Sequence, residues 1–494
     1  MPTNYYDVVV VGQELAAIAA GGLLARRGFR VLWLGDGEAV GQPDGYSWQE
    51  LELPTEPFVF AGAERPAPRR VLAETALTQV IKRRTQPCRP SFQAVLPHAR
   101  IDVGEVDVLA REIEREFSHD RVMTQAALVH AAESDRRIEA LLEIDVTLPP
   151  QRFWERREVA RVGVDPRREA DPLAGFAARH AFRAFFASVA AVTSDLDPRD
   201  LVPAATARLY TTWRRGTSRL VGGRQGLRDL FLEKIEAQSG ELQPQLEAAR
   251  ILLRRGKVTG ILPRGRKEAL GCGAVIVGSP ARALALCDGE KAPKTLAAAL
   301  GAVRVAFRRY TLNLVVPTEA VPEGMGSIVV AVDDDTRPLA PENAFLLCAS
   351  DPDGQGRVVL TASTLVADAP ADEDGQVRAR LVARVARIVP FLAENLLCGH
   401  SPHDGLPAIG RLAEKGPPPM RLPMTPVVRA TAPAWGLGGF PYATGWKGLY
   451  TASRATLPAL GLEGEFTAAW GLARILTLAE GRRDFLKRRA IGRG

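Results

Sequence analysis

The opening stretch of the chain, residues 6–35, constrains the fold more than any other. Residues 7–11, DVVVV, are mostly β-branched, which is typical of a strand buried on both faces of a parallel sheet. A turn at Gly12 leads into the helical pattern LAAIAAGGLLARRG, and the apolar segment RVLWLG follows. A strand, a helix and a strand within about 30 residues predict a βαβ unit. The chain is therefore expected to begin with a Rossmann-like domain.

The glycine loop of this unit departs from the pattern that binds dinucleotides. In a G-x-G-x-x-G loop, glycines let backbone N–H groups approach a pyrophosphate at the helix N-terminus. The corresponding positions here are Gly12, Glu14 and Ala17. Glu14 adds bulk and negative charge where the backbone must come closest to phosphate, whereas Ala17 still permits close packing. In such a unit, an acidic residue at the end of the second strand binds a ribose hydroxyl. That position is Gly35 here, and the nearest acid is Asp36, one residue later.

The rest of the chain alternates between helical and strand-rich blocks. Residues 104–195 have mainly helical patterns, and GGRQGLRDLFLEKIEAQSGEL near residue 220 indicates a second glycine turn followed by a helix. Residues 300–370 alternate apolar and polar positions, which predicts antiparallel strands. A helical pattern follows, and Pro390 is expected to kink or divide it. Blocks in this order predict interleaved domains. We assign 1–65, 205–290 and 425–494 to a Rossmann-like domain, and 66–204 and 291–424 to a substrate and cap domain.

The last part of the chain, GLYTASRATLPALGLEGEFTAAWGLARIL, raises the specificity of this interpretation. It resembles the closing motif of the flavoprotein superfamily that includes phytoene desaturases, amine oxidases and the GDP dissociation inhibitors of Rab proteins. Leu449 to Ala452 match the motif's strand, Pro458 its proline, Gly461 and Gly464 its turn glycines, and Phe466 to Ile475 its helix. The resemblance implies an α/β fold with a Rossmann-like FAD-binding domain, an interleaved mixed antiparallel-sheet domain and a helical cap. It also implies FAD as cofactor and a long apolar substrate.

Several cofactor-contacting positions of this family carry other residues. The family's Gly-Asp pair falls on Ser453 and Arg454, and its first turn glycine on Ala459. Because Glu14 and Arg454 carry opposite charges, we predict that they pair across the place of the pyrophosphate. In the alternative, Arg454 binds a phosphate while Glu14 turns to solvent. FAD binding is therefore open, and altered or absent binding is favoured.

Composition and charge narrow the partners. The chain has 64 basic and 57 acidic residues, and six cations gather in GRRDFLKRRAIGRG at its end. That segment is interpreted either as a solvated tail or as a contact with anionic lipid headgroups. The sequence contains no basic patch interleaved with aromatic residues, so nothing in it indicates a nucleic-acid partner. The cysteines are scattered and odd in number, and the sequence has no leader pattern, which together predict a cytoplasmic protein. It also has no long apolar run, so any contact with a membrane is expected to be peripheral. The five cysteines are Cys88, Cys272, Cys287, Cys348 and Cys398.

Two further segments contain residue types that occur in binding sites. CGHSPHD, residues 398–404, contains metal-binding residue types, but its spacing matches no closed zinc site, so no metal is expected. Trp435, Tyr442 and Trp446 lie just before the closing strand, where they either line a pocket or pack in the core. No catalytic residue is identified from the sequence.

Two functions from different classes follow. The favoured one is a protein with a degenerate flavin site that binds or carries an apolar ligand or a lipidated partner, much as the Rab inhibitors use this fold without redox chemistry. The alternative is a flavin-dependent oxidoreductase or desaturase with an altered pyrophosphate site, in which flavin would supply the redox chemistry.

Overall fold

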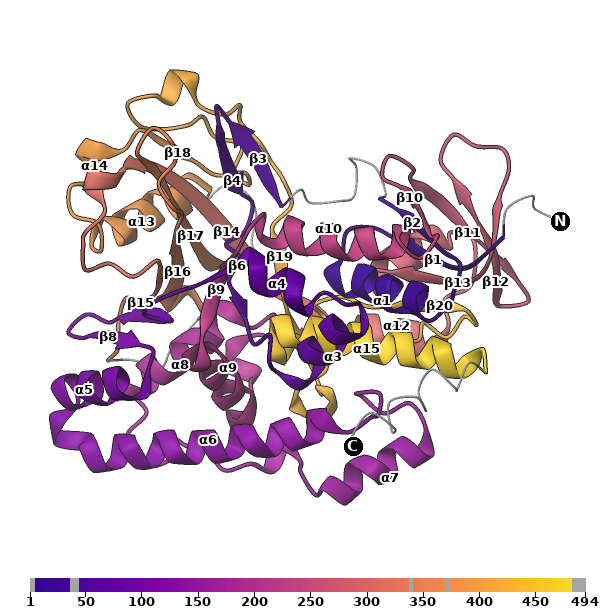
Figure 1. Cartoon of the computed structure of the whole chain (residues 1–494), viewed down its shortest axis with the longest axis horizontal. Helices are drawn as coiled ribbons and strands as arrows, with labels where there is room; N and C mark the ends of the chain where they lie inside the picture. The colour runs from indigo at the N-terminus through magenta and orange to yellow at the C-terminus, as the bar shows by residue number, and fades with distance from the viewer. Residues whose placement is uncertain (1–4, 36–43, 337–340, 369–373, 482–494) are drawn as a thin grey trace.

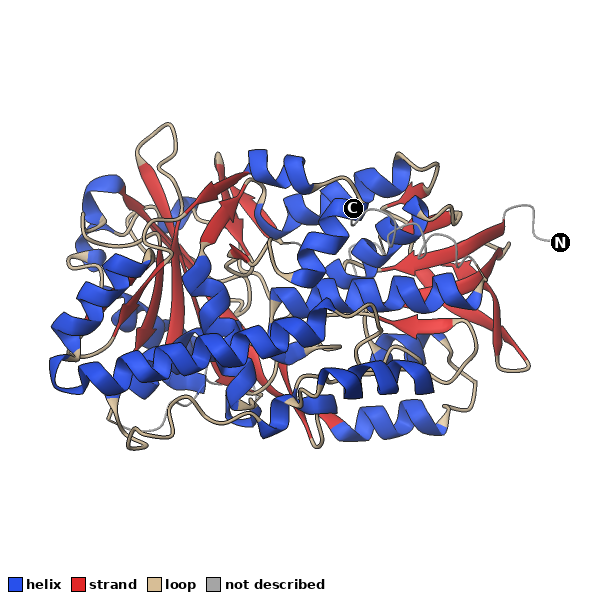
Figure 2. Cartoon of the chain, turned by 60° about the horizontal axis from the view of Figure 1, so that its bottom comes forward, coloured by secondary structure: helices blue, strands red, loops and turns tan. Residues whose placement is uncertain are grey.

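The computed structural model describes residues 5–35, 44–336, 341–368 and 374–481 of the chain. Two large sheets stand at opposite ends of the molecule, and helices occupy much of the space between them (Figures 1 and 2). Strands from the start, the middle and the end of the chain build one of these sheets, so the chain passes repeatedly between the two halves. This architecture confirms the predicted fold class.

The first sheet carries the predicted βαβ start. Its strands are β1 (Tyr5–Val11), β2 (Val31–Leu34), β10 (Glu241–Gln243), β11 (Ala248–Arg254), β12 (Lys257–Pro263), β13 (Leu270–Val277) and β20 (Leu449–Thr451). The order is β10-β2-β1-β13-β12-β11, and β20 pairs with β13. The pairings of β10, β2, β1, β13 and β20 are parallel, whereas β12 pairs antiparallel with both its neighbours. Val9 and Val10 are fully buried, as a strand covered on both faces requires.

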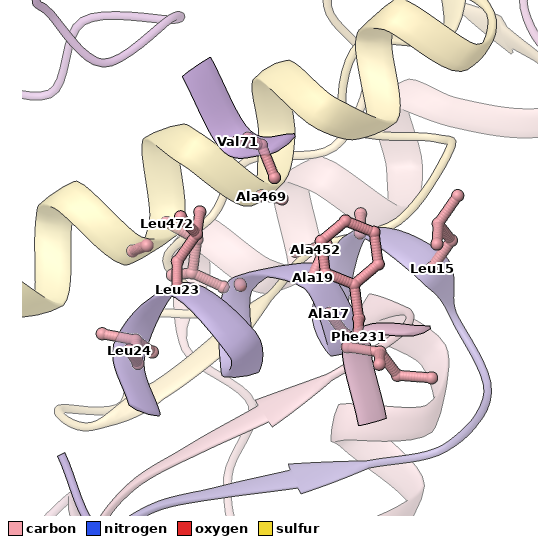
Figure 3. Close-up of a cluster of buried hydrophobic side chains, with 14 of the residues drawn as sticks. Leu15, Ala17, Ala19, Leu23, Leu24, Val71, Phe231, Ala452, Ala469 and Leu472 are labelled. Carbon is pink, nitrogen blue, oxygen red and sulfur yellow. The ribbon is translucent and has the colours of Figure 1, made fainter. Parts of the chain in front are cut away.

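Three helices pack together on one face of this sheet: α1 (Leu15–Arg26), α10 (Gly223–Glu236) and α15 (Leu462–Ala479). Figure 3 shows their side chains in one buried cluster, with Leu23 of α1, Phe231 of α10 and Leu472 of α15 among them. Ala17 is completely buried in α1, where its small side chain permits close packing. Each large apolar side chain buried in this way contributes about 1.5–3 kcal/mol to stability.

The second sheet is mainly antiparallel, as the alternating pattern predicted. Its strands are β7 (Phe92–Val95), β8 (Arg100–Val103), β14 (Val303–Pro317), β15 (Ile328–Val332), β16 (Ala344–Ala349), β17 (Arg357–Ala367), β18 (Cys398–His400) and β19 (Thr425–Ala430). The order is β18-β14-β17-β16-β15-β7-β8, with β19 beside β14, and the β15–β7 pairing is parallel. Helix α13 (Asp374–Ala386) packs on this sheet, and Pro390 separates it from α14 (Leu392–Asn395), as predicted.

A largely helical segment follows β8, in agreement with the helical patterns of the sequence. It comprises α5 (Val106–Glu116), α6 (Arg121–Glu143), α7 (Phe153–Val162), α8 (Ala181–Thr193) and α9 (Pro203–Arg215). Buried charges tie this segment to the first sheet's helices. Arg208 of α9 lies 2.7 Å from both Asp135 of α6 and Glu463 of α15. Because such charges are costly to bury alone, the pairing fixes α9 between α6 and α15.

Smaller elements connect the two halves. They are β3 (Gly45–Trp48), β4 (Leu51–Pro54), β5 (Phe60–Ala61), α3 (Pro66–Glu74), α4 (Thr78–Arg84), β6 (Thr85–Pro87), β9 (Thr217–Leu220), α11 (Pro280–Leu286) and α12 (Lys294–Ala302). Strands β3 and β4 form a hairpin, and β5, β9 and β6 form a third sheet. Within the ranges that the structure describes, no helix is both long and apolar enough to cross a bilayer.

Three predictions remain predictions at this level. The domain boundaries are not tested by the strand assignments. Asp36 and the basic segment of residues 482–494 lie outside the described residues, so neither the ribose contact nor the membrane contact is placed in the structure.

Candidate functional site

The loop between β1 and α1 is open at its first glycine and filled at its second fingerprint position. Gly12 has a φ of 96°, which favours glycine, and a Cβ built there would meet no atom of the described residues within 4 Å. Glu14 is the N-cap residue of α1, yet among the described residues its side chain caps no backbone N–H group. Its Cγ instead fills the space that a side chain at Gly278 would need.

The carboxylate of Glu14 is poorly compensated. Its Oε2 atom is buried and has no hydrogen-bond partner in the described part of the chain. Burial raises the pKa of Glu14, and the positive charge of Arg454 opposes that rise. A carboxylate at this place also occupies the positive end of the α1 dipole, where an anion would otherwise bind.

The predicted ion pair between Glu14 and Arg454 is wrong. Nη1 of Arg454 lies 3.2 Å from Oε1 of Glu56 and 3.5 Å from Oδ1 of Asp195. Glu14 and Arg454 therefore interact only through their longer-range charges. The reason is local: after β20 the side chain of Arg454 reaches the segment that follows β4 and the end of α8, both of which supply an acid.

Glu56 and Asp195 share a second arginine in a buried network. Nε of Arg309 lies 3.1 Å from Glu56, and its Nη2 lies 3.6 Å from Asp195. Arg309 also donates to the carbonyl of Val192 at 2.5 Å, and Thr425 donates to Glu56 at 2.8 Å. These contacts hold two carboxylates and two guanidiniums in one cluster that joins β14, α8 and the turn after β20.

The two carboxylates respond to this environment in opposite directions. Burial alone would raise the pKa of Glu56, but Arg454 and Arg309 outweigh it and lower the pKa to about 2. For Asp195 burial dominates, and its pKa rises to about 6 although the same arginines oppose the change. Glu56 is therefore the principal counter-ion of the cluster.

Two arginines of α10 extend the network toward α1. Arg224 lies 2.5 Å from Glu465 of α15. Arg228 pairs with Asp44 and donates to the carbonyl of Gln13 at 2.6 Å. Spaced four residues apart, the two arginines share one helix face and could have been found from the pattern GGRQGLRD. The glycine turn and helical pattern predicted that helix, but not the role of these side chains or of Glu56, Asp195 and Arg309.

The end of β2, where a ribose-binding acid is expected, is closed. A Cβ at Gly35 would collide with the backbone carbonyl of Pro244, which follows β10. The amide of Gln13 donates to the carbonyl of Gly35 at 3.0 Å and so bridges this strand end to the glycine loop. The neighbourhood of Gly35 leaves no room for a side chain at that position.

The remaining closing-motif residues shape the turn before α15. Ser453 accepts a hydrogen bond from the backbone N–H of Ala455 at 3.2 Å, which turns the chain after β20. Gly461 has a φ of 53° and precedes α15, and Gly464 lies in the first turn of α15, where a Cβ would collide with the carbonyl of Leu457. Both glycines permit close backbone packing next to Arg454.

Two neighbouring spaces, which share several lining residues, adjoin this network. The smaller has a volume of about 90 Å³ and is lined by Glu56, Asp195, Arg224, Arg309 and Arg454 among others. The larger, which we call the inter-sheet cavity, has a volume of about 600 Å³ and lies between α10, the β3–β4 hairpin and the second sheet. Its apolar lining includes Leu53, Pro57, Phe58, Val59, Leu220, Ile328 and Val359. A cavity of about 880 Å³ lies away from this network, beside α3, α4 and β9.

The other sequence candidates have structural roles. The hydroxyl of Tyr46 lies 2.8 Å from Nδ1 of His400, and Asp404 pairs with Arg378 at 2.6 Å. No group of metal-ligating side chains gathers anywhere in the described ranges. Tyr442 is fully buried and donates to the carbonyl of Leu148 at 2.8 Å. Trp435 and Trp446 pack in hydrophobic clusters, so of the two interpretations core packing applies to all three aromatic residues.

Comparison with solved structures identifies the fold. An oxidoreductase from Methanosarcina mazei matches with a TM-score of 0.59 and 16% identity, over 95% of this chain and 99% of that chain. Putrescine oxidase bound to putrescine matches with a TM-score of 0.56 and 13% identity, over 96% and 99%. Rab GDI from Plasmodium falciparum matches with a TM-score of 0.50 and 11% identity, over 95% and 97%.

The chain has the fold of these oxidoreductases and of Rab GDI. Family models and curated proteins give no match to the sequence. The resemblance inferred from the two ends of the sequence is therefore confirmed for the fold, which these proteins share across nearly their whole length.

Proposed function

We propose that this chain uses the flavoprotein fold to bind an uncharged apolar ligand, or the apolar group of a lipidated partner, in the inter-sheet cavity, without conventional flavin chemistry. The observation that carries the proposal is the buried network beside that cavity, in which Arg454 is paired with Glu56 and Asp195. By the resemblance to the family, Arg454 stands at the closing-motif position whose residue contacts the flavin.

The residues at the expected FAD site do not fit that cofactor. Glu14 sets a buried carboxyl side chain, packed beside Gly278, at the N-terminus of α1, where the fingerprint glycine would leave room for a pyrophosphate. The residue at the expected ribose position is Gly35, and the carbonyl of Pro244 leaves no room for an acidic side chain there. Beside Arg454 the free volume is about 90 Å³, whereas sites for drug-sized ligands have about 300–1,000 Å³. No reaction step through a flavin is therefore derived for this chain.

The charges around the inter-sheet cavity favour a neutral ligand. Asp44 pairs with Arg228, Arg224 pairs with Glu465 at 2.5 Å, and Arg219 pairs with Asp351 at 2.6 Å. Glu56 is held by Arg454, and the remaining charged lining residue, Glu52, is exposed. Because the buried charges are compensated within the protein, burial of apolar surface is what remains to drive binding.

Binding of the neutral dye Nile red, measured by its fluorescence, and displacement of the dye by farnesol test this proposal. Phe58 is half-buried and lines both spaces, so Phe58→Asp places a charge on the apolar wall. We expect Phe58→Asp to weaken the affinity for Nile red by about tenfold or more, since a charge is costly against an apolar ligand. Phe153→Asp is the matched control, because Phe153 is 81% exposed on α7. Equal affinities in the two variants, or no binding by the native chain, would refute the proposal.

One observation favours the alternative, a flavin-dependent oxidoreductase or desaturase with an altered phosphate site. The space beside Gly12 is open, as a loop that approaches a pyrophosphate would need. In that case the chain would carry flavin when purified, which the proposed carrier would not. Contact of residues 482–494 with anionic lipid, and a cytoplasmic location, also stay proposals.

A further inference from the structure

A separate cavity lies at the end of α13, on the far side of the molecule from the first sheet. We call it the α13 cavity. It has a volume of about 490 Å³ and is lined by the β7–β8 turn, the ends of β15 and β16, and the last turn of α13. Among the described residues that line it, the charged ones are Arg100, Arg384 and Arg387 against the single acid Asp333. His98 completes its titratable lining, and Asp334 and Asp335 follow Asp333 without lining the cavity.

The central guanidinium of this cavity is buried and only partly compensated. The side chain of Arg384 is 10% exposed, and its Nε lies 2.7 Å from Oδ2 of Asp333. Its Nη1 donates to Thr364 at 3.0 Å, and its guanidinium lies 4.7 Å from the ring centroid of Phe345. Nη2 has no hydrogen-bond partner within the described residues. Burial lowers the pKa of Arg384, with Arg387 acting in the same direction and Asp333 opposing.

Asp333 must serve two cations. Its other oxygen, Oδ1, lies 3.0 Å from Nη2 of Arg387, whose side chain is 63% exposed. Arg100 is exposed, and its side chain has no ion pair in the part of the chain that the structure describes. Three cations against one carboxylate leave an excess of about two positive charges at the mouth of the cavity.

We propose that the α13 cavity binds a small phosphate monoester with an apolar body. A phosphate monoester carries about −1.5 to −2 charges at pH 7, which matches the excess, and the planar guanidinium binds phosphate through two parallel hydrogen bonds. The apolar body would lie on the wall formed by Val95, Leu96, Ala331, Val332, Phe345 and Ile388. The volume of about 490 Å³ lies in the range of small-molecule sites, which is about 300–1,000 Å³, and favours a small molecule over a macromolecular segment.

A purely structural role would also place arginines at this point. Cations in the last turn of a helix stabilise its dipole, and Arg384 is the basic residue of the last turn of α13. That role accounts for Arg384 and does not require Arg387 and Arg100 to face the same cavity. The two explanations therefore differ in whether an anion binds there.

Calorimetric titration of the full chain with phenyl phosphate distinguishes them, with inorganic phosphate and phenol as the separate halves of that probe. We expect phenyl phosphate to bind more tightly than either half, and to bind more weakly as salt increases. Arg387→Gln should weaken its binding by about tenfold, the loss of one charge-assisted contact. Arg380→Gln, on the same helix and exposed but not among the lining residues, removes a charge without removing a contact and should leave the affinity within about twofold.

Three results would overturn this proposal. They are no binding of phenyl phosphate by the native chain, equal weakening by Arg387→Gln and Arg380→Gln, and binding of phenol as tight as that of phenyl phosphate. Phe58→Asp separates this site from the inter-sheet cavity, because it should leave phenyl phosphate binding unchanged. Since Arg387 is mostly exposed, its variant is expected to fold, and the rise of the thermal unfolding midpoint with phenyl phosphate gives a second measurement.

Discussion

The inter-sheet cavity and the α13 cavity are both lined by arginines, but they differ in how far acidic side chains neutralise those arginines. Beside the inter-sheet cavity, Arg454 and Arg309 face Glu56 and Asp195, so two cations meet two acids. In the α13 cavity, one acid faces three cations among the described lining residues. The number of arginines therefore does not predict the ligand. What differs is whether the protein supplies their counter-ions, and this favours a neutral ligand in one cavity and an anion in the other.

The largest expected effect comes from breaking the compensated cluster. Arg454→Met leaves Glu56 and Asp195 with Arg309 as their remaining cation, and we expect the free energy of unfolding to fall by about 3–5 kcal/mol. The comparison variant is Arg384→Met, which leaves Asp333 paired with Arg387 and should cost less than about 2 kcal/mol. Urea denaturation measures both. Equal losses would mean that charge compensation does not separate the two cavities.

A smaller effect, which depends on pH, separates the two acids of the cluster. The pKa of Glu56 is lowered from 4.5 to about 2, so its ionised form stabilises the fold above pH 4.5, and this contribution is lost as the pH falls toward 2. At pH 7, Glu56→Gln should lower the free energy of unfolding by about 3 kcal/mol. In strong acid its cost should disappear.

Asp195 should behave in the opposite way. Its pKa is raised from 3.8 to about 6, so ionisation is less favourable in the fold, and stability falls as the pH rises from 3.8 through 6. Asp195→Asn should therefore be neutral or mildly stabilising at pH 7, and it should flatten the decline between these pH values. Unfolding free energies of the native chain and both variants across this range check the pair. A greater loss for Asp195→Asn than for Glu56→Gln at pH 7 would reverse our assignment of the principal counter-ion.

The fold was largely predictable because its signals are local or periodic. The run DVVVV marked a buried parallel strand, the alternation in residues 300–370 marked antiparallel strands, and Pro390 divided a helix as its missing N–H group requires. The closing segment added the resemblance that identified the architecture. Each of these features can be recognised within about 30 residues.

The candidate site was predictable only in part, because its contacts join distant segments. Arg454 was identified from the closing motif, but nothing in the sequence indicated which acid it would meet. Its partners lie in LPTEPFVF and just after α8, where Glu56 and Asp195 have no periodic or motif signal. The negative charge of Glu14 suggested that it pairs with Arg454. After β20, however, the chain brings Arg454 to Glu56 and Asp195 instead.

The central claim is that side chains of this network fill the place of the cofactor. The most direct test is the visible absorbance spectrum of the chain, purified without added flavin and again after incubation with FAD and gel filtration. Our account predicts no flavin absorbance in either sample, because the volume beside Arg454 is about 90 Å³ and Glu14 occupies the N-terminus of α1. Flavin absorbance near one equivalent per chain in either sample would contradict it.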